Sequence, residues 1–594
     1  MKELRFKKEH VRWDRRNVTT WIPYHENGQV YNVFESGFSN MVEMFDAIEK
    51  RHPNKELLVD EAGNRLTFRE VFESARVLSR ALLDPTFSGL KRGDRVGVCS
   101  KNSFEWIISY LAAVYAGMIV IPMNSWWTPR ELEFGIKHAD CKLVFADRER
   151  IDRIAQVPKS SLANLKIVLI SSSEESSSTT INEHHHPVVI SGLTVDTMAG
   201  WMREARTKPA TMRPETPITP DEPAMIMYTS GTTSFPKGVV LTHRGVGHTC
   251  TMNDKVFAEA ESKMKGPPRA ILLCVPLFHA TGLYAVFFNA LLAGRKVVIM
   301  RKWNAEKALE LVEREKVTHF TGVPTMILEM LASPDLKKRD ISTLKNIGSG
   351  GAPPPAGVAK SVSEKMKASP SQGFGLTEVN AVATMIGAKD YLKKPTSCGR
   401  AVPGVEIQIW SEEEDHVEVK RGEVGRIVIR GPNLMLEYWK DAEATSKCIT
   451  KDGWFKCGDL GHMDEDGFLF ISGRSQDLII RGGENISART VEEAVFANFE
   501  TIQECAVFAY PHPTLGEEVG LAIYMKQGEQ PPSLEEIRSR CSSSIAQFML
   551  PTGLTVFKTK LPRGATGKTV KKDIKEMLKN NKLDNWTVHS KAKL

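Results

Sequence analysis

The chain has 594 residues, of which 41% are apolar and 25% are charged. This composition is typical of globular proteins, and the length exceeds what one hydrophobic core usually serves, so we expect at least two domains. The net charge of +7 is small for this length, and the basic residues are scattered. Both observations argue against a nucleic-acid-binding protein.

The cysteines and the N-terminal residues exclude further classes. Nine cysteines occur without a CxxC pair or a matched histidine spacing, which favours free thiols in a reducing compartment over a zinc site or a disulfide framework. Residues 1–16 are charged throughout, so we expect no secretory signal. The most membrane-like stretch, 106–123, is interrupted by Gly117 and Pro122. We interpret it as a buried helix followed by a short strand, and we expect no transmembrane segment.

Helical and strand-like patterns alternate through the N-terminal part of the chain. Helices are expected at 71–83, 104–116, 281–292 and 305–315. Short apolar runs predict strands at 95–99, 142–146, 167–170, 224–227, 270–275, 296–300 and 319–322. This alternation indicates an α/β fold with two doubly wound subdomains, the first within the initial two hundred residues and the second after them.

The C-terminal part has a different pattern. From about Gly399, short runs such as 405–409 and 425–430 are separated by glycines, which is typical of a small β-barrel-like subdomain. Further on, helices are expected at 491–498 and 534–547, and strands at 504–509 and 520–525. The predicted parts are a tail at 1–37, a large N-terminal domain at 38–475 with a low-complexity insertion at 171–187, a small mobile α+β C-terminal domain at 476–580, and a tail at 581–594.

The segment 228–238, with the sequence YTSGTTSFPKG, carries the strongest chemical signal. Glycines let backbone N–H groups approach an anion, hydroxyls add donors, and a lysine adds a positive charge, so the segment is suited to phosphate. It is not a Walker loop, because Lys237 precedes the final glycine. An ordinary polar surface loop has a similar composition and is the alternative.

A second motif, QGFGLTE at 372–378, combines two glycines with an aromatic ring, a hydroxyl and a carboxylate. Phe374 between the glycines offers a flat apolar surface to an adenine ring. Thr377 can donate to an α-phosphate, and Glu378 can bind Mg²⁺ as a hard oxygen ligand. The alternative is a glycine-rich turn before a helix that begins near Thr377.

Together these motifs resemble those of the adenylate-forming superfamily, which contains acyl-CoA synthetases, luciferases and the adenylation domains of peptide synthetases. The resemblance covers residues 38–577. It implies that the chain uses ATP and Mg²⁺ to convert a carboxylic acid into an acyl-adenylate, releases pyrophosphate, and then transfers the acyl group to coenzyme A. The implied ATP- and AMP-binding residues are Thr229, Ser230, Gly231, Thr232, Thr233, Lys237, Gly350, Gly351, Ala352, Gln372, Gly373, Phe374, Gly375, Asp459 and Arg474.

The resemblance also implies residues that act on the acid and on coenzyme A. Lys568, in LPRGATGK, matches the mobile C-terminal lysine, which joins Thr377 and Glu378 as a catalytic residue. His279 matches a position beside the acid's carboxylate. Adenylation domains that take amino acids have an aspartate there, so we do not expect an α-amino acid substrate. The implied coenzyme A residues are Gly482 and Gly483, and the implied hinge of the C-terminal domain is Gln476.

Three positions depart from the pattern of the superfamily. Ser234 stands where most members have glycine, Phe374 replaces a tyrosine, and Gln476 replaces an aspartate or a lysine. The first departure bears on the freedom of the phosphate loop to take positive φ angles. The third bears on how easily the C-terminal domain turns.

Neutral and often small residues surround the expected acyl pocket, namely Ala280, Gly282, Val323, Ala381, Val382 and Met385. They predict an apolar acid, such as a medium- or long-chain fatty acid. An aryl (coumarate-like) acid and a luciferase-like adenylating oxygenase remain alternatives. The last residues, Ala592-Lys593-Leu594, match a peroxisomal address and would bind the peroxisomal import receptor. If that match is due to chance, we expect a cytoplasmic protein.

Overall fold

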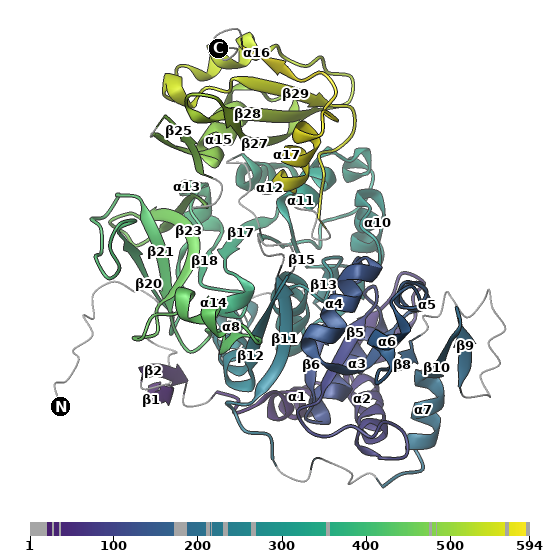
Figure 1. Cartoon of the computed structure of the whole chain (residues 1–594). Coiled ribbons are helices and arrows are strands. Elements are labelled where there is room, and N and C mark those ends of the chain that lie inside the picture. Colours follow the sequence, from purple (N-terminus) through teal and green to yellow (C-terminus); the bar gives the residue numbers. More distant parts are fainter. Residues whose placement is uncertain are drawn as a thin grey trace.

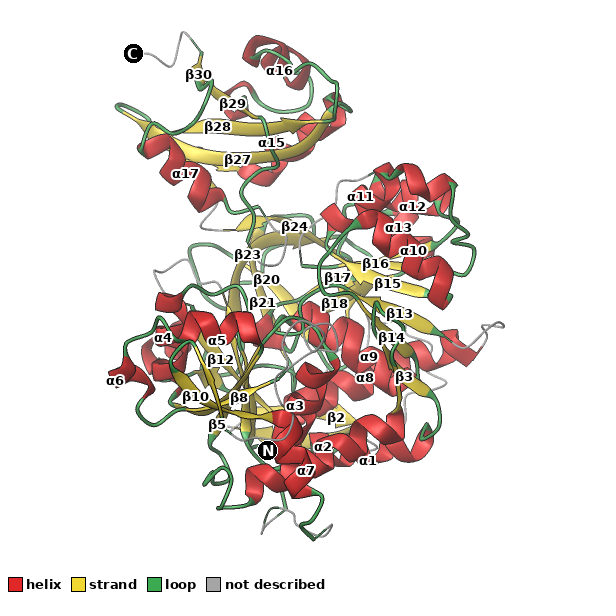
Figure 2. Cartoon of the chain, turned by 90° about the vertical axis from the view of Figure 1, so that its right-hand side faces the viewer, coloured by secondary structure: helices red, strands yellow, loops and turns green. Residues whose placement is uncertain are grey.

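The computed structural model (Figures 1 and 2) describes residues 21–26, 29–34, 37–170, 187–209, 214, 217–229, 236–262, 269–351, 357–474, 478–482, 484–564 and 569–589. Within these ranges the fold is mixed α/β, with a large N-terminal domain and a small C-terminal domain. The small domain lies at the top of Figure 1, in yellow-green and yellow. The predicted boundary at 475–476 and residues 171–186 of the predicted insertion 171–187 fall outside the described residues.

The first nine-stranded sheet of the described chain has a parallel centre and antiparallel edges. Side chains along its central strands alternate between two apolar clusters, one on each face of the sheet. One cluster includes the helices α2 (Phe68–Leu83) and α3 (Phe104–Tyr115), and the other includes α4 (Pro129–Ala139) and α5 (Arg148–Ile154). In spatial order the strands are β22 (Glu437–Tyr438), β12 (Lys237–Thr242), β11 (Pro223–Thr229), β6 (Ile119–Pro122), β5 (Arg95–Cys99), β7 (Cys141–Ala146), β8 (Lys166–Leu169), β10 (Leu193–Thr197) and β9 (Val188–Ile190). The helices beside it are α2 (Phe68–Leu83), α3 (Phe104–Tyr115), α4 (Pro129–Ala139), α5 (Arg148–Ile154), α6 (Lys159–Leu162) and α7 (Met198–Ala205).

The second nine-stranded sheet has the same kind of parallel centre, from β17 to β3. Its strands, in spatial order, are β19 (Arg400–Ala401), β18 (Thr384–Ile386), β17 (Ser369–Phe374), β16 (Asn346–Ser349), β15 (His319–Gly322), β13 (Ala270–Leu273), β14 (Lys296–Ile299), β3 (Glu56–Val59) and β4 (Arg65–Thr67). The chain crosses between the two sheets, because β3 and β4 come from its first seventy residues. The expectation that the initial two hundred residues form one subdomain by themselves is therefore wrong. Edge pairing depends on tertiary contacts that a local pattern does not contain.

The helices next to the second sheet include an unusual one. The predicted helix 281–292 is divided into a π-helix, η1 (Thr281–Phe288), and a short α-helix, α9 (Asn289–Ala293). π-Helical turns are rare and occur frequently at functional sites. The other helical elements of this region are α1 (Met41–Arg51), α8 (His243–Ser262), α10 (Ala305–Glu315), α11 (Pro324–Ala332), η2 (Pro334–Lys337), α12 (Val358–Lys365), η3 (Thr377–Val379) and α13 (Ala388–Lys393).

A four-stranded antiparallel sheet forms the small β subdomain that the glycine-separated runs predict. It consists of β20 (Glu406–Trp410), β21 (Gly425–Arg430), β23 (Phe455–Met463) and β24 (Leu469–Arg474), with α14 (Ala442–Cys448) nearby. The C-terminal domain contains β25 (Leu478–Arg481), β26 (Glu484–Ser487), β27 (Ile502–His512), β28 (Gly516–Met525), β29 (Gly553–Phe557), β30 (Thr587–Val588), α15 (Ala488–Asn498), α16 (Leu534–Cys541), η5 (Gln547–Met549) and α17 (Lys571–Lys579).

Several local predictions need adjustment. The expected N-terminal tail contains an antiparallel hairpin of β1 (Trp21–Glu26) and β2 (Gln29–Phe34), and the expected C-terminal tail supplies β30. The helix predicted at 534–547 ends at Cys541. The stretch 106–123 is the buried part of α3 followed by β6, with Gly117 at a φ of 70° between them. None of the described helices combines the length and the apolar character that a membrane span requires.

Candidate functional site

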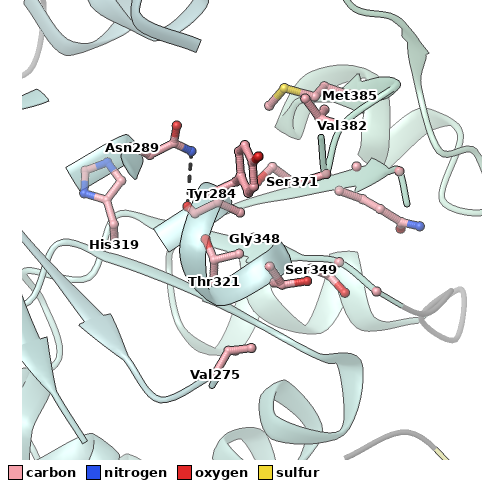
Figure 3. Close-up of a pocket in the computed structure, with 18 of the residues that line it drawn as sticks. Val275, Tyr284, Asn289, His319, Thr321, Gly348, Ser349, Ser371, Val382 and Met385 are labelled. Carbon is pink, nitrogen blue, oxygen red and sulfur yellow. Dashed lines mark hydrogen bonds between the residues drawn. The ribbon is translucent and has the colours of Figure 1, made fainter. Parts of the chain in front are cut away.

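A cavity of about 400 Å³ lies between the second nine-stranded sheet and the helices η1 and α9 (Figure 3). The sheet contributes residues of β15, β16 and β17, and η1 contributes Thr281, Tyr284 and Ala285. Figure 3 shows Asn289 and His319 at one end of the cavity, and Val382 and Met385 toward the other.

The predicted adenine-side residues meet where the parallel strands end. Gly350 and Gly351 follow β16, and the motif at 372–378 begins in β17, so neighbouring strands deliver both to the same edge of the sheet. Gln372 is buried, and its Oε1 accepts a hydrogen bond from the hydroxyl of Tyr391 at 2.6 Å. Phe374 is half-buried at the end of β17. The cavity-lining members of the predicted nucleotide set are Gly350, Gly351, Gln372, Gly373 and Gly375, and the predicted catalytic residue Thr377 lines the cavity beside them.

The turn that carries Thr377 and Glu378 requires glycine at one position. A Cβ atom on Gly375 would lie 2.0 Å from the carbonyl oxygen of Ala381, which is backbone and has no side-chain freedom to retreat. Asn380 and Ala381 both have positive φ angles, of 49° and 79°. Consecutive non-glycine residues in this region cost free energy and are maintained only where the surroundings fix them.

Buried amide groups fix this turn from behind. Asn380 is fully buried, and its Oδ1 accepts from the hydroxyl of Tyr284 at 2.5 Å. The Nδ2 of Asn380 donates to the carbonyl oxygen of Asn433 at 2.9 Å, and Asn433 in turn donates to the carbonyl oxygens of Val379 and Val382. Because Tyr284 also lines the cavity, the cavity wall and the turn are parts of one hydrogen-bonded unit.

Tyr438 brings the described end of the phosphate motif next to Glu378. Its hydroxyl donates to Glu378 Oε1 at 2.9 Å, and Lys237 Nζ lies 4.7 Å from the centre of its ring. Burial and the Glu378 carboxylate raise the pKa of Tyr438 well above its usual value, so the hydroxyl keeps its proton. Lys237 pairs with Thr229 across the hairpin of β11 and β12. The sequence analysis did not select Tyr438, since a lone tyrosine outside a motif gives no signal.

Asp459 and Arg474 are also brought together. They face each other on β23 and β24, and Arg474 Nε donates to Asp459 Oδ1 at 3.0 Å. Asp459 is buried, whereas 56% of the Arg474 side chain is exposed. Arg474 therefore fixes the orientation of the Asp459 carboxylate. This arrangement is compatible with the prediction that both residues bind the ribose.

Most of the predicted acyl-side residues line the cavity. His279 does so directly before η1, and its ring lies 4.6 Å from that of Phe278. Gly282 does not itself line the cavity, although its neighbours Ala280 and Thr281 do. A Cβ there would lie 2.3 Å from the carbonyl oxygen of Pro276, which shows that this glycine permits close packing of the π-helix. The acyl-side residues that do line the cavity are Ala280, Val323, Ala381, Val382 and Met385.

In the C-terminal domain, Gly482 lies in the turn between β25 and β26 with a φ of 58°. Its N–H donates to the carbonyl oxygen of Leu515 at 2.9 Å. Among the described residues no group of three or more His, Cys, Asp or Glu side chains is arranged to hold a metal ion. The predicted site residues that lie outside the described part of the chain are Ser230, Gly231, Thr232, Thr233, Ala352, Gln476, Gly483 and Lys568, together with Ser234 and the terminal Ala592, Lys593 and Leu594.

Comparisons with known proteins agree with this geometry. The family described as AMP-binding enzyme matches residues 45–439, and that described as AMP-binding enzyme C-terminal domain matches residues 491–568. The long-chain-fatty-acid–CoA ligase of Bacillus subtilis (strain 168) is 31% identical over 525 residues, covering 86% of this chain and 90% of that protein. The mitochondrial medium-chain acyl-CoA ligase ACSF2 of Bos taurus is 30% identical, with 90% and 87% covered. ATP-bound MatB from Rhodopseudomonas palustris has a TM-score of 0.74 at 27% identity, with 91% and 99% covered.

Proposed function

Since the chain belongs to the AMP-binding enzyme family and is an AMP-forming acid–CoA ligase of the acyl-CoA synthetase branch, we propose that it acts on an acid with an apolar, medium- or long-chain body. The observation that carries this proposal is that Thr377, Gly350 and His279 line the same cavity. Next to them the wall is formed by small or flexible apolar side chains such as Ala280, Val323 and Met385.

In the proposed first step, a carboxylate oxygen of the acid attacks the α-phosphorus of ATP. The new O–P bond forms as the bond to pyrophosphate breaks, and negative charge increases on the phosphate oxygens. Thr377 donates to the α-phosphate, and Lys568 is positioned between that phosphate and the attacking carboxylate. The phosphate segment 229–238, including Lys237, holds the departing pyrophosphate. Asp459 and Arg474 hold the ribose, and Phe374 with its flanking glycines faces the adenine.

In the proposed second step, the thiol sulfur of coenzyme A attacks the acyl carbon and AMP leaves with the electrons of the acyl–phosphate bond. We propose that the C-terminal domain, 476–580, turns about Gln476 between the two steps. This movement withdraws Lys568 and brings Gly482 and Gly483 toward the pantetheine arm. The exposed Arg474 at the end of β24 leads directly into the proposed hinge.

The residues present suit a magnesium ion that is shared with ATP. Mg²⁺ is usually held by one or two carboxylates together with substrate phosphates, so the lack of a larger acidic cluster among the described residues is compatible with it. Glu378 would hold the ion, since Tyr438 engages only its Oε1. When bound, the ion would offset the charge that develops on the phosphates. The protein's own part is to orient Glu378 through Tyr438 and the buried turn.

The test is a panel of carboxylic acids assayed with ATP, with and without coenzyme A, in which pyrophosphate, AMP and thioester are measured. We expect acid-dependent pyrophosphate release that Lys568→Ala reduces by at least about a hundredfold. The same variant should still convert a supplied acyl-adenylate to thioester, because Lys568 is withdrawn in the second step. Absence of a coenzyme A-dependent thioester with every acid would contradict the proposed function. Oxygen consumption in its place would favour the luciferase-like alternative, and a preference for cinnamate-type acids would favour the aryl alternative.

We also propose a peroxisomal location, on the ground that the sequence ends in Ala592-Lys593-Leu594. A fluorescent protein fused before the first residue should enter peroxisomes. The same fusion without the last three residues should remain in the cytoplasm. Identical distributions of the two fusions would exclude this address.

A further inference from the structure

The wall of the cavity becomes polar away from the predicted nucleotide site. Four neighbouring strands are in register, so Ile271, His319, Asn346 and Ser369 form one row across the sheet. His319, Asn346 and Ser369 are the first residues of β15, β16 and β17, whereas the predicted adenine-side residues lie at the ends of these strands. All four residues of the row line the cavity. Their side chains occupy the same face of the sheet, because residues paired across neighbouring strands point to the same side.

The row two residues further along these strands has the same polar character. Thr321, Gly348 and Ser371 are paired across β15, β16 and β17, and all three line the cavity (Figure 3). A sheet face that binds only a hydrocarbon chain would be expected to present apolar side chains here. Hydroxyl, amide and imidazole groups on these two rows of one sheet face indicate that part of the ligand is polar.

A guanidinium group completes this end of the cavity. Arg295 follows Gly294, the left-handed cap of α9, and its N–H donates to the carbonyl oxygen of Ala290 at 2.9 Å. It is 6% exposed and lines the cavity, and burial lowers its pKa to about 10, so it remains charged at neutral pH. Its position after the last turn of a helix is favourable for a cation. None of the described residues that line the cavity is Asp or Glu.

His319, at the same end of the cavity, is neutral. Thr318 Oγ1 donates to the carbonyl oxygen of Ala270 at 2.9 Å, so in the 2.8 Å contact between Thr318 Oγ1 and His319 Nδ1 the imidazole must be the donor. His319 Nε2 then accepts from Asn346 Nδ2 at 3.1 Å. Burial, Arg295 and Arg269 lower the pKa of His319 to about 3.

Two buried acceptor groups on the wall have no hydrogen-bond partner within the described structure. They are Asn289 Oδ1 and the hydroxyl of Ser349, which is 6% exposed. The Nδ2 of Asn289 donates to the carbonyl oxygen of Ala285 at 3.1 Å, which fixes the orientation of the amide (Figure 3). Polar groups left in this state cost free energy unless a ligand or water satisfies them. The Ser349 hydroxyl can donate to a ligand oxygen, whereas Asn289 Oδ1 can only accept, for example from a water molecule.

We propose that the acid has a second carboxylate at the far end of its chain, and that Arg295 binds this carboxylate at the polar end of the cavity. The inference rests on the proposed function, because it assigns the first carboxylate to the nucleotide end. The three steps along β15 from His319 to Gly322 span roughly 10 Å. A medium-length dicarboxylate such as octanedioate therefore fits, with its methylene groups against Ala280, Val323 and Met385. Arg295 acts as a specificity residue and takes no part in the adenylation itself.

The experiment compares three acids of equal chain length, octanedioate, octanoate and ω-hydroxyoctanoate, by kcat/KM for acid-dependent AMP formation with ATP and coenzyme A. The wild-type protein should prefer octanedioate over both others by about tenfold to a hundredfold. Arg295→Met, which keeps length and removes charge, should lose this preference and use octanoate as well as or better than octanedioate. Arg295→Lys should retain part of the preference.

Arg269→Met is the matched control, because Arg269 lies close to His319 without lining the cavity. It should change the ratio between the acids by no more than about twofold. If Arg295→Met does not fold, as judged by its thermal unfolding, Arg295→Gln provides the second variant. It keeps a polar side chain at this position and removes the charge, so it should also shift the ratio toward octanoate.

Two results would overturn the inference while leaving the proposed function intact. One is a wild-type protein that uses octanoate as well as octanedioate, and the other is an Arg295→Met protein with an unchanged ratio. Equal use of ω-hydroxyoctanoate and octanedioate would also overturn it, because the end group would then be recognised only as polar. Failure of all three acids to give a coenzyme A-dependent thioester, together with failure of the wider acid panel, would instead count against the proposed function.

Discussion

The two nine-stranded sheets both have a parallel centre with antiparallel edges, but the side chains on their faces differ in polarity and size. In the first sheet, β5, β6 and β7 present Val, Ile, Leu and Phe to helices on both faces, and these side chains are almost completely buried. In the second sheet, β15, β16 and β17 present His, Thr, Asn, Gly and Ser on the face toward η1. Side-chain bulk fills the first interior, and its absence leaves the cavity in the second.

The comparison shows how one fold serves two purposes. A doubly wound sheet that is apolar on both faces supplies stability, because burial of apolar area is the dominant favourable contribution to folding. A sheet with small and polar residues on one face loses part of that contribution and gains a space for a ligand. The positions that distinguish the two sheets are therefore the positions to change.

The largest effect is expected from Gly375→Ala. The added Cβ would overlap the carbonyl oxygen of Ala381 at 2.0 Å, so the turn with Thr377 and Glu378 must move. We expect kcat/KM to fall by at least about a hundredfold, because small displacements of positioning groups have effects of that size. Pyrophosphate release measures the loss.

Gly97→Ala, in β5 of the first sheet, is the matched variant. Its Cβ would lie 2.9 Å from Met123 Sδ and 3.0 Å from Val144 Cγ2, which are side-chain atoms. It should lower the free energy of unfolding by about 1–3 kcal/mol and leave kcat nearly unchanged. If both variants lost stability and activity to the same degree, the functional difference between the sheets would be refuted.

The next largest effect concerns the pair of Tyr438 and Glu378. Glu378→Gln should reduce the rate of pyrophosphate release by about a hundredfold to a thousandfold, because a charged group at the phosphates is lost. Tyr438→Phe removes only the 2.9 Å hydrogen bond to that carboxylate and should cost about tenfold. The double variant should be no slower than Glu378→Gln alone, since the two residues act as one unit. Multiplied losses in the double variant would show that Tyr438 acts independently of Glu378.

Gly348→Val would place a branched apolar side chain on the cavity face of the second sheet, as the central strands of the first sheet have on theirs. A Cβ at this position lies 3.0 Å from Thr321 Oγ1 and 3.4 Å from Ser371 Oγ, so the branched side chain would extend into the cavity. Acids that reach the polar end should lose about tenfold or more in kcat/KM, while acetate or butanoate should be affected little. A uniform loss for short and long acids would contradict the assignment of this row to the chain of the acid.

The smallest effect is on the dependence of stability on pH. Burial lowers the pKa of His319 to about 3 and that of His248 to about 4, from an unperturbed value of 6.5. Below pH 6.5 the unfolded chain therefore binds protons that the folded chain does not, and stability falls as the pH is lowered toward 4. Each histidine contributes a slope of about 1.4 kcal/mol per pH unit in this window. Urea unfolding of the wild type and of His248→Gln should show a shallower slope in the variant, and equal slopes would contradict a depressed pKa for His248.

The regular elements were largely predictable from the sequence. The predicted bounds of β5, β15, β21 and α10 coincide with those of the structure, because each is a short apolar or amphipathic run between clear turn signals. The π-helix was not predictable, because Thr281–Phe288 is apolar on all sides and gives no periodicity. The place of β3 and β4 in the second sheet depends on the pairing of β3 with β14, which lies about 240 residues further along the sequence.

Sequence motifs identified many residues of the candidate site, whereas the residues of its polar wall became apparent only from the register of the paired strands. Lys237, Gln372 and Thr377 belong to contiguous sequence motifs that can be recognised in a single sequence. His319, Asn346 and Ser369 are single residues in unrelated segments, and only the pairing of three strands places them side by side. Arg295 gives no signal at all, since an arginine after a glycine at a helix end is usually interpreted as a surface residue.

The π-helix η1 has an evolutionary consequence. A π-helical turn can be regarded as an α-helical turn with one residue inserted, so deletion of a single residue within Thr281–Phe288 would restore regular α-helical winding. Each residue of an α-helix advances the direction of the side chains by about 100°. Such a deletion would present a different set of side chains to the sheet while the nucleotide motifs on β16 and β17 kept their places. One codon lost or gained in this segment would be enough for a descendant of this chain to accept a different acid.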